Sequence, residues 1–460
     1  MSDIYFHVMN KFNEINQKIG KYRWTICTLV FFATTINYLD RNVLGLLKTT
    51  LTEEMDWTES DYAHIVMAFQ LAYALGMLGI GRVIDKVGTK LGYFFSLLGW
   101  SIAAMVHGLA HSTFTFGAAR AFLGVSEAGN FPAANKTVAE WFPKKERALA
   151  TGIYNSGANI GAILAPLCVP WIAVNWGWEW AFVATGAIGL IWLFFWWVLY
   201  ESPEKKLTNG KLTQAEYDFI NSDKEEAVKE EIALAEKPES ISWFKLLTYR
   251  QTWSFFLGKF MTDPVWWFYI FWLPAFLEGE NARKIAEGNP EGVISWHIAI
   301  AVVFTIATVG SVAGGWLPKY LVNKGKSVYQ ARMASMFIYA LLPLTVLSAQ
   351  YVGQINTWYA VLLIGLACAG HQAWSANIFT TVSDMFPKKA VASVTGIGGM
   401  SGSFGGMLIA WAAGLLLDHY KLLGTIEVGY GIMFIICSVA YVAAWLVMKI
   451  LVPKFKQVNL

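Results

Sequence analysis

The sequence predicts an all-α membrane protein with twelve transmembrane helices, arranged as two pseudo-symmetric halves of six. The first observation is composition: of 460 residues 56% are hydrophobic, against about 45–50% in soluble domains. The second is a recurrence of apolar segments about 20 residues long, enough to cross roughly 30 Å of hydrocarbon. The third is a polar stretch at 201–250 that divides these segments six and six.

The apolar segments and the polar stretches between them define the expected organisation. We expect a cytoplasmic N-terminal segment at 1–23, an N-terminal half at 24–200, a cytoplasmic linker at 201–250, a C-terminal half at 251–451 and a cytoplasmic tail at 452–460. In the linker, Thr213 and Glu216 have the spacing of a capping box, which predicts a surface helix there. The predicted spans lie at 24–46, 61–82, 90–110, 113–136, 148–174, 179–200, 252–277, 295–318, 332–350, 357–381, 391–417 and 427–450.

Lys and Arg residues predict the orientation, because cytoplasmic loops carry them in excess. They fall before the first span and in alternate loops, whereas the opposite loop at 52–61 holds five acidic residues and no basic one. Both termini are therefore expected in the cytoplasm. The N-terminal stretch lacks the features of a removable signal peptide. The net charge of +3 follows from this asymmetry, so we expect no nucleic-acid partner.

The four cysteines indicate no metal site and no disulfide framework. All of them fall within predicted spans and lack metal-ligand spacing, so they are expected to be small packing residues. They are Cys27, Cys168, Cys368 and Cys437.

An internal repeat supports the two halves. The segment EWFPKKERALATGI at 140–153 returns as DMFPKKAVASVTGI at 384–397, each between the fourth and fifth spans of its half. Parallel repeats related by an axis along the membrane normal are implied. The spans that follow carry small residues four apart, a spacing that lets helices approach closely. A packing role and a hinge role both remain open for these glycines, which are Gly157, Gly161, Gly398, Gly402 and Gly406.

Four ionisable residues lie inside predicted spans of the N-terminal half. They are Asp40 and Arg41 on the first span, and Arg120 and Glu127 on the fourth. Unpaired in lipid, they would cost on the order of 10 kcal/mol together. They are therefore expected to line an internal cavity.

Height along the spans suggests how these charges pair. At about 1.5 Å per residue, Asp40 and Arg120 reach a similar level, whereas Glu127 lies about 10 Å closer to the cytoplasm. We expect Asp40 to pair with Arg120, and Glu127 to lack a fixed partner. Arg41 would then be free to clamp a substrate carboxylate with two hydrogen bonds. The alternative is a closed network of all four charges that only fixes helix packing.

Other polar side chains extend the candidate site. On the N-terminal half we expect hydrogen-bonding and ring-stacking contacts with a hydroxylated substrate from Asn37, Tyr38, Gln70, Tyr73, Asn155, Ser156 and Asn159. On the tenth span the candidates are His371, Gln372, Trp374, Ser375 and Asn377. A lone histidine is more often a packed hydrogen-bonding group. Lys259 and Asp263 on the seventh span are spaced i,i+4, which favours mutual neutralisation over substrate contact.

The loop between the second and third spans carries a family motif. GRVIDKVGTK, at 81–90, resembles the signature of the major facilitator superfamily. That resemblance implies a conformational latch between the halves, formed in the outward-facing state by Gly81, Asp85, Lys86 and Gly88. The corresponding loop of the C-terminal half, at 314–326, lacks the aspartate, so the latch is expected in the N-terminal half only.

A narrower resemblance covers nearly the whole chain. INYLDRNVLG, ARAFLGVSEAGNFPAA, AEWFPKKERALATGIYNSGANIGA and GHQAWSAN resemble the anion:cation symporter branch and, within it, the bacterial hexuronate transporters. This implies import of glucuronate or galacturonate with protons across the bacterial inner membrane, by a monomer without a cofactor. It also implies that Asp40 and Glu127 bind protons and that Arg41 and Arg120 serve substrate binding and charge coupling.

The resemblance leaves other substrates and classes open. Aldonate-specific relatives carry a glutamine on the fifth span where this chain has Ala158, with Asn159 next to it. An aldonate such as galactonate therefore remains the alternative substrate. A proton-driven drug antiporter would have the same fold, but two cavity arginines argue against a cationic substrate. No nucleophile–base set, metal cluster or large extramembrane domain points to an enzyme or a receptor.

Overall fold

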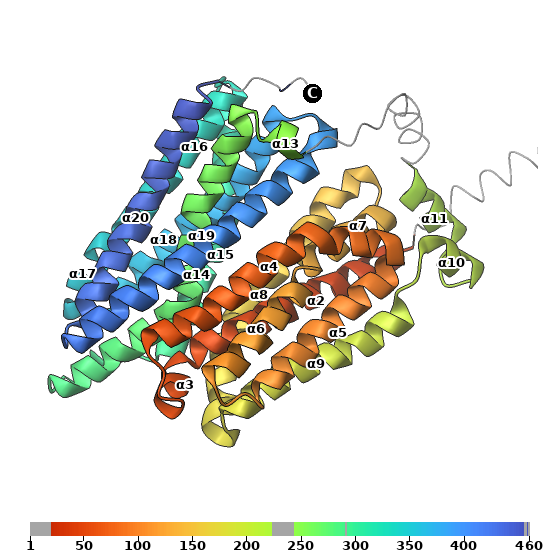
Figure 1. The fold of residues 1–460 in the computed structure, drawn as a ribbon. Helices are drawn as coiled ribbons and strands as arrows, with labels where there is room; N and C mark the ends of the chain where they lie inside the picture. Colours follow the sequence, from red (N-terminus) through yellow and green to blue (C-terminus); the bar gives the residue numbers. More distant parts are fainter. Residues whose placement is uncertain (1–19, 223–242, 290–291, 455–457, 459–460) are drawn as a thin grey trace, which may run out of the picture.

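The computed structural model describes residues 20–222, 243–289, 292–454 and 458, and it places the spans in two helical halves (Figure 1). The N-terminal half consists of α2 (Tyr22–Leu46), the short α3 (Lys48–Glu54), α4 (Glu59–Val87), α5 (Thr89–His107), α6 (Thr113–Glu127), α7 (Asn130–Trp141), α8 (Lys144–Trp176) and α9 (Trp178–Leu199). The C-terminal half consists of α14 (Arg250–Ala286), α15 (Trp296–Asn323), α16 (Val328–Leu341), the 3₁₀ helix η2 (Leu342–Ser348), α17 (Ala349–Ile355), α18 (Thr357–Met385), α19 (Lys388–Leu422) and α20 (Ile426–Leu451).

Length and composition alone do not identify every span. Within the described residues, nine helical stretches are long and apolar enough to cross a membrane. The other three of the twelve are α2, the α6–α7 pair and α14. All three carry intramembrane charges that the sequence had singled out, which lower the hydropathy of α2 and α14. The α6–α7 pair is excluded by length, because its two helices have 15 and 12 residues.

Two spans predicted as single helices are interrupted. The fourth span breaks at Ala128 and Gly129, between α6 and α7. A Cβ on Gly129 would approach the Cβ of Ser96 on α5 to 2.8 Å, so α5 packs directly against the break. The ninth span passes from α16 through η2 into α17, and it ends at Ile355 rather than at residue 350.

The linker helices lie at one end of the bundle, which we call the linker end, and α3 lies at the opposite end, the far end (Figure 1). They are α10 (Pro203–Thr208), α11 (Gln214–Asn221) and α13 (Trp243–Leu246). Thr213 caps α11 as expected, by accepting from the backbone N–H of Glu216. The Glu216 carboxylate instead accepts from the backbone N–H groups of Tyr22 and Arg23. The predicted surface helix is therefore tied to the start of α2.

The two halves meet at the far end. Asp418 of α19 accepts hydrogen bonds from the backbone N–H groups of Glu59 (2.7 Å) and Ser60 (2.9 Å) at the start of α4. The Ser60 hydroxyl donates to the same carboxylate. The Tyr62 hydroxyl donates to the carbonyl of Phe271 on α14 at 2.9 Å. Toward the linker end the ribbons of the two halves diverge (Figure 1).

Glycines allow α2 and α8 to touch. A Cβ on Gly157 would overlap the carbonyl of Phe31 and lie 2.9 Å from Oγ1 of Thr35. One on Gly161 would overlap the Thr35 carbonyl in the same way. The close approach predicted from the small-residue spacing is therefore confirmed for this pair of helices.

Candidate functional site

The Arg41–Glu127 ion pair lies at the centre of the candidate site. Nε and Nη2 of Arg41 both donate to Oε2 of Glu127, at 2.8 and 2.6 Å. Only 1% of Arg41 and 0% of Glu127 is exposed. Nη2 also donates to the side-chain carbonyl of Asn37 at 3.4 Å. The second oxygen of Glu127 has no hydrogen-bond partner among the described residues.

The prediction that Glu127 lacks a partner and that Arg41 is free is therefore wrong for this conformation. Side chains tilt toward the N-terminus of their own helix. On α2 that direction is toward the linker end, whereas on the antiparallel α6 it is toward the far end. Arg41 and Glu127 therefore reach toward one another and close the height difference that Cα positions alone suggested.

Four aromatic rings surround the Arg41 guanidinium. Its central carbon lies 4.9 Å from the ring centre of Tyr38, 5.3 Å from Phe69, 5.0 Å from Tyr73 and 5.2 Å from Trp267. These distances suit cation–π attraction. Because Trp267 belongs to α14, the guanidinium faces the interface between the halves. We call Arg41, Glu127 and these four rings the Arg41 cluster.

Asp40 and Arg120 do not form the predicted ion pair. Neither carboxylate oxygen of Asp40 has a hydrogen-bond partner among the described residues. The polar group beside it is the hydroxyl of Thr185 on α9, which donates to the Phe182 carbonyl. Nη2 of Arg120 donates to the backbone carbonyl of Arg41 at 3.2 Å. The prediction failed because equal height does not place two side chains on facing sides of their helices.

In the C-terminal half, the predicted residues of α18 divide into two groups. His371 packs against Trp266, with ring centres 4.8 Å apart, and its Nδ1 lies 2.6 Å from the hydroxyl of Tyr441. Trp374 is buried edge-on against Tyr441. Gln372 and Ser375 are only partly buried. His371 and Trp374 are thus interior packing residues, whereas Gln372 and Ser375 remain the better candidates for contact with a ligand.

Asn377 and the residues of α8 have different surroundings. The Asn377 amide donates to the carbonyls of Gly314 and Ala373 and accepts from Arg332, which fits a structural role. Asn155 is exposed, whereas Asn159 is partly buried. Among the described residues, the guanidinium of Arg41 forms its hydrogen bonds with Glu127 and Asn37, and none is found with Asn155 or Asn159.

The motif residues between α4 and α5 contact their own half. Asp85 accepts from Nζ of Lys136 on α7 at 2.9 Å, while Lys86 is exposed. Gly88 has a φ of +88° between the two helices, a conformation that favours glycine. The space around Gly81 is open. A latch between the halves stays a prediction for the other conformation.

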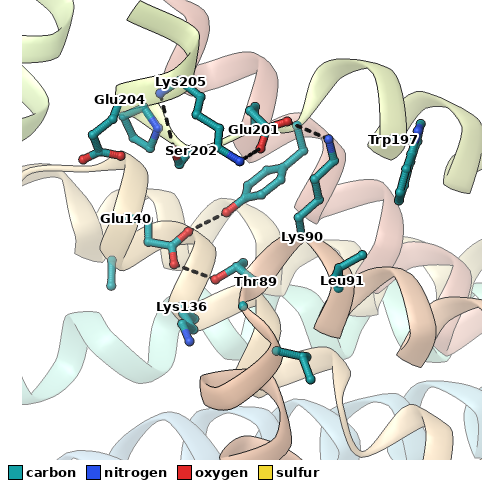
Figure 2. Close-up of a pocket in the computed structure, with 15 residues that line it drawn as sticks. Thr89, Lys90, Leu91, Lys136, Glu140, Trp197, Glu201, Ser202, Glu204 and Lys205 are labelled. Carbon is teal, nitrogen blue, oxygen red and sulfur yellow. Dashed lines mark hydrogen bonds and ion pairs between the residues drawn. The ribbon is translucent and has the colours of Figure 1, made fainter. Parts of the chain in front are cut away.

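A cavity of about 730 Å³ at the linker end includes Gly88 in its wall (Figure 2). Lys90 and Lys205 both pair with Glu201, at 2.8 and 3.6 Å. Glu140 accepts from the hydroxyls of Thr89 and Tyr200. Partial burial alone would raise the pKa of Glu201, but the two lysines lower it below its ordinary value. These charges satisfy one another, and the cavity contains none of the residues of the Arg41 cluster.

The sequence did not single out Phe69 or Trp267 as members of the site. Both lie in runs of apolar and aromatic residues, where one ring gives no signal of its own. The described residues contain no group of three or more His, Cys, Asp or Glu side chains that could hold a metal ion.

Comparison with known proteins identifies the class. The family model described as Major Facilitator Superfamily matches residues 30–410. The chain belongs to this superfamily and is a membrane transport protein. It is 31% identical over 407 residues to the hexuronate transporter of Escherichia coli (strain K12), covering 87% of this chain and 89% of the relative. It is 30% identical over 409 residues to the D-galactonate transporter of Escherichia coli O6:H1, covering 88% and 91%. The solved structure of a D-xylose-proton symporter has the same fold, with a TM-score of 0.72, 14% identity and coverage of 95% and 100%.

Proposed function

We propose that this transporter imports a sugar acid with one carboxylate together with protons, and that its preferred substrate is a hexuronate. The Arg41–Glu127 pair supports this most directly, because the guanidinium is held by a carboxylate that a proton can neutralise. Similarity to transporters of hexuronate and D-galactonate supports the substrate class. An aldonate is the second candidate, because the D-galactonate relative is nearly as similar.

The proposed mechanism couples proton and substrate through Arg41. Protonation of Glu127 removes the negative charge that holds Arg41, and the guanidinium then binds the substrate carboxylate with two hydrogen bonds. The rings of Tyr38 and Tyr73 stack on the sugar while their hydroxyls bond to its hydroxyl groups. Asp40, a buried carboxylate without an ion-pair partner among the described residues, is the second proton-binding group. Arg120, which pairs with neither carboxylate here, holds the backbone of Arg41 in place.

Alternating access completes the proposal. We place the linker end in the bacterial cytoplasm, as the distribution of Lys and Arg favours. The structure with its contacts at the far end is then the inward-facing state. Proton and substrate enter from the outside after those contacts open, and they leave when the linker ends of the halves separate.

Replacement of Glu127 by glutamine tests this function. Glu127→Gln should abolish proton-driven accumulation of galacturonate in proteoliposomes, because Arg41 is no longer released by a proton. Exchange of internal for external substrate should persist, since the clamp itself is intact. Asp218→Asn, on the exposed side of α11, is the control and should leave both activities unchanged. Uphill uptake by Glu127→Gln at the wild-type rate would exclude the proposed role.

A further inference from the structure

A second charged pair lies in the C-terminal half, outside the Arg41 cluster. Nζ of Lys259 is 2.6 Å from Oδ2 of Asp263, one turn further along α14. The Lys259 side chain is 6% exposed and that of Asp263 is 19% exposed. The ammonium also lies 4.2 Å from the ring centre of Phe379 on α18. The predicted mutual neutralisation is confirmed, so this pair presents little net charge.

The pair lies one helical turn from the Arg41 cluster, on the side of the linker end. Asp263 precedes Trp267 by four residues on the same face of α14, a rise of about 6 Å. Trp267 contacts Arg41 and packs against Phe69, with ring centres 6.3 Å apart. The face of α14 that carries Asp263 is therefore the face turned toward the N-terminal half.

The two tyrosines of the Arg41 cluster lie at the level of Asp263. Tyr38 lies three residues from Arg41, and Tyr73 four residues from Phe69, both toward the linker end. At this level Tyr38 and Asp263 are partly exposed, whereas Arg41, which lies one turn closer to the far end, is buried.

The position of Asp263 is fixed by its neighbour on α19. A Cβ at Gly402 would overlap the Asp263 carboxylate, so glycine is what allows the side chain to lie there. One turn along the same helix, a Cβ at Gly406 would lie 2.8 Å from the Trp267 ring. Two glycines of α19 thus make room for Asp263 and Trp267, the two side chains of α14 that face the N-terminal half.

We propose that the Lys259–Asp263 pair binds the end of the substrate opposite the carboxylate held by Arg41. The pair thereby restricts transport to sugar acids with a single carboxylate. This rests on the proposed function, with Arg41 binding the carboxylate. At the end of the sugar opposite its carboxylate, hydroxyl groups donate to Asp263 and accept from Lys259. A second carboxylate there meets the negative charge of Asp263, and the cation beside it is already neutralised.

The test compares a hexuronate with its diacid. Galactarate carries a second carboxylate in place of the aldehyde carbon of galacturonate. That aldehyde carbon closes galacturonate into a ring, whereas galactarate is an open-chain diacid. Their binding to the purified full-length protein is measured as ligand-dependent thermal stabilisation. Wild type should bind galacturonate at least about tenfold more tightly than galactarate. Asp263→Asn leaves Lys259 unneutralised and should reduce that preference by about tenfold or more.

Two variants serve as controls. Asp384→Asn removes a carboxylate of the same half that pairs with Arg332 at 2.9 Å, and it should keep the preference. Asp263→Glu keeps the charge and should also keep it. If Asp263→Asn does not fold, the double variant Lys259→Met with Asp263→Leu removes both charges together and should lose the preference with weaker galacturonate binding.

The outcomes separate this inference from the proposed function. Equal binding of the diacid and the monoacid by wild type would overturn the inference alone, and so would an unchanged preference in a folded Asp263 variant. Absence of galacturonate binding to wild type would overturn the proposed function itself, and the inference with it.

Discussion

At the residue scale, the behaviour of Arg41 follows from its burial. Taking two charges out of water costs several kcal/mol per ion, and their attraction offsets this only while both partners are present. Arg41 and Glu127 are both fully buried, and Asn37 and the surrounding rings supply further favourable contacts. The pair is therefore stable when closed, yet either partner alone is costly.

This asymmetry predicts how single and double variants differ. Arg41→Gln leaves Glu127 as an uncompensated buried charge and should destabilise the protein by about 3–5 kcal/mol. The double variant Arg41→Gln with Glu127→Gln should recover most of that loss, but it should not bind galacturonate. Thermal unfolding and ligand titration measure the two quantities. Galacturonate binding by the double variant with wild-type affinity would contradict the clamp.

Which charges lie buried inside the helical bundle could be predicted from the sequence, but which of them pair could not. Ionisable residues in an apolar span are conspicuous because lipid makes them costly. Pairing depends on helix rotation and on the direction in which side chains lean. Those features placed Arg41, rather than Asp40, against the fourth span.

At the element scale, the contact between α2 and α8 depends on glycines. Gly157→Ala and Gly161→Ala would each push a methyl group into the backbone of α2. The clash should cost about 1–3 kcal/mol, more than the gain of about 0.5–1 kcal/mol from replacing a helical glycine. Gly152→Ala is the matched control on the same helix, because a Cβ there would meet nothing within 4 Å. It should be neutral or stabilising. Apparent melting temperatures measure the stability of the three variants, and equal values for all of them would refute the packing role of Gly157 and Gly161.

The elements themselves were largely predictable. Long apolar segments and a repeated motif gave the number of spans and their grouping, because the bilayer forces backbone groups into helices. The break between α6 and α7 was not predicted, because it depends on the packing of Ser96 against Gly129. A contact between distant segments leaves no pattern in either one.

At the scale of the whole molecule, Asp418 holds the far ends of the halves together. Its carboxylate satisfies backbone N–H groups at the start of α4, where the helix dipole also favours a negative charge. No pattern in the sequence indicates which conformation the halves adopt, since under the proposed alternating access one chain forms both the inward-facing and the outward-facing state. Only contacts between the halves, such as this one, distinguish them.

Asp418→Asn should therefore shift the balance between conformations. Asparagine keeps one acceptor oxygen and loses the other, and one hydrogen bond to a charged group contributes about 1.5–3 kcal/mol. The conformation with the far ends of the halves apart should therefore become at least about tenfold more populated. Distances between spin labels placed on the far ends of the two halves measure that population. Asp61→Asn, which alters a cap within one half, is the control. An unchanged distance distribution for Asp418→Asn would show that this contact does not hold the far end closed.

Proton uptake on ligand binding shows whether Arg41 exchanges Glu127 for the substrate carboxylate. Calorimetric titration of galacturonate in buffers of different ionisation enthalpy gives the number of protons bound with the ligand. At a pH where the Arg41–Glu127 pair is closed in the empty protein, wild type should take up about one proton that Glu127→Gln does not. Equal proton uptake by wild type and Glu127→Gln, with both binding galacturonate, would contradict the exchange.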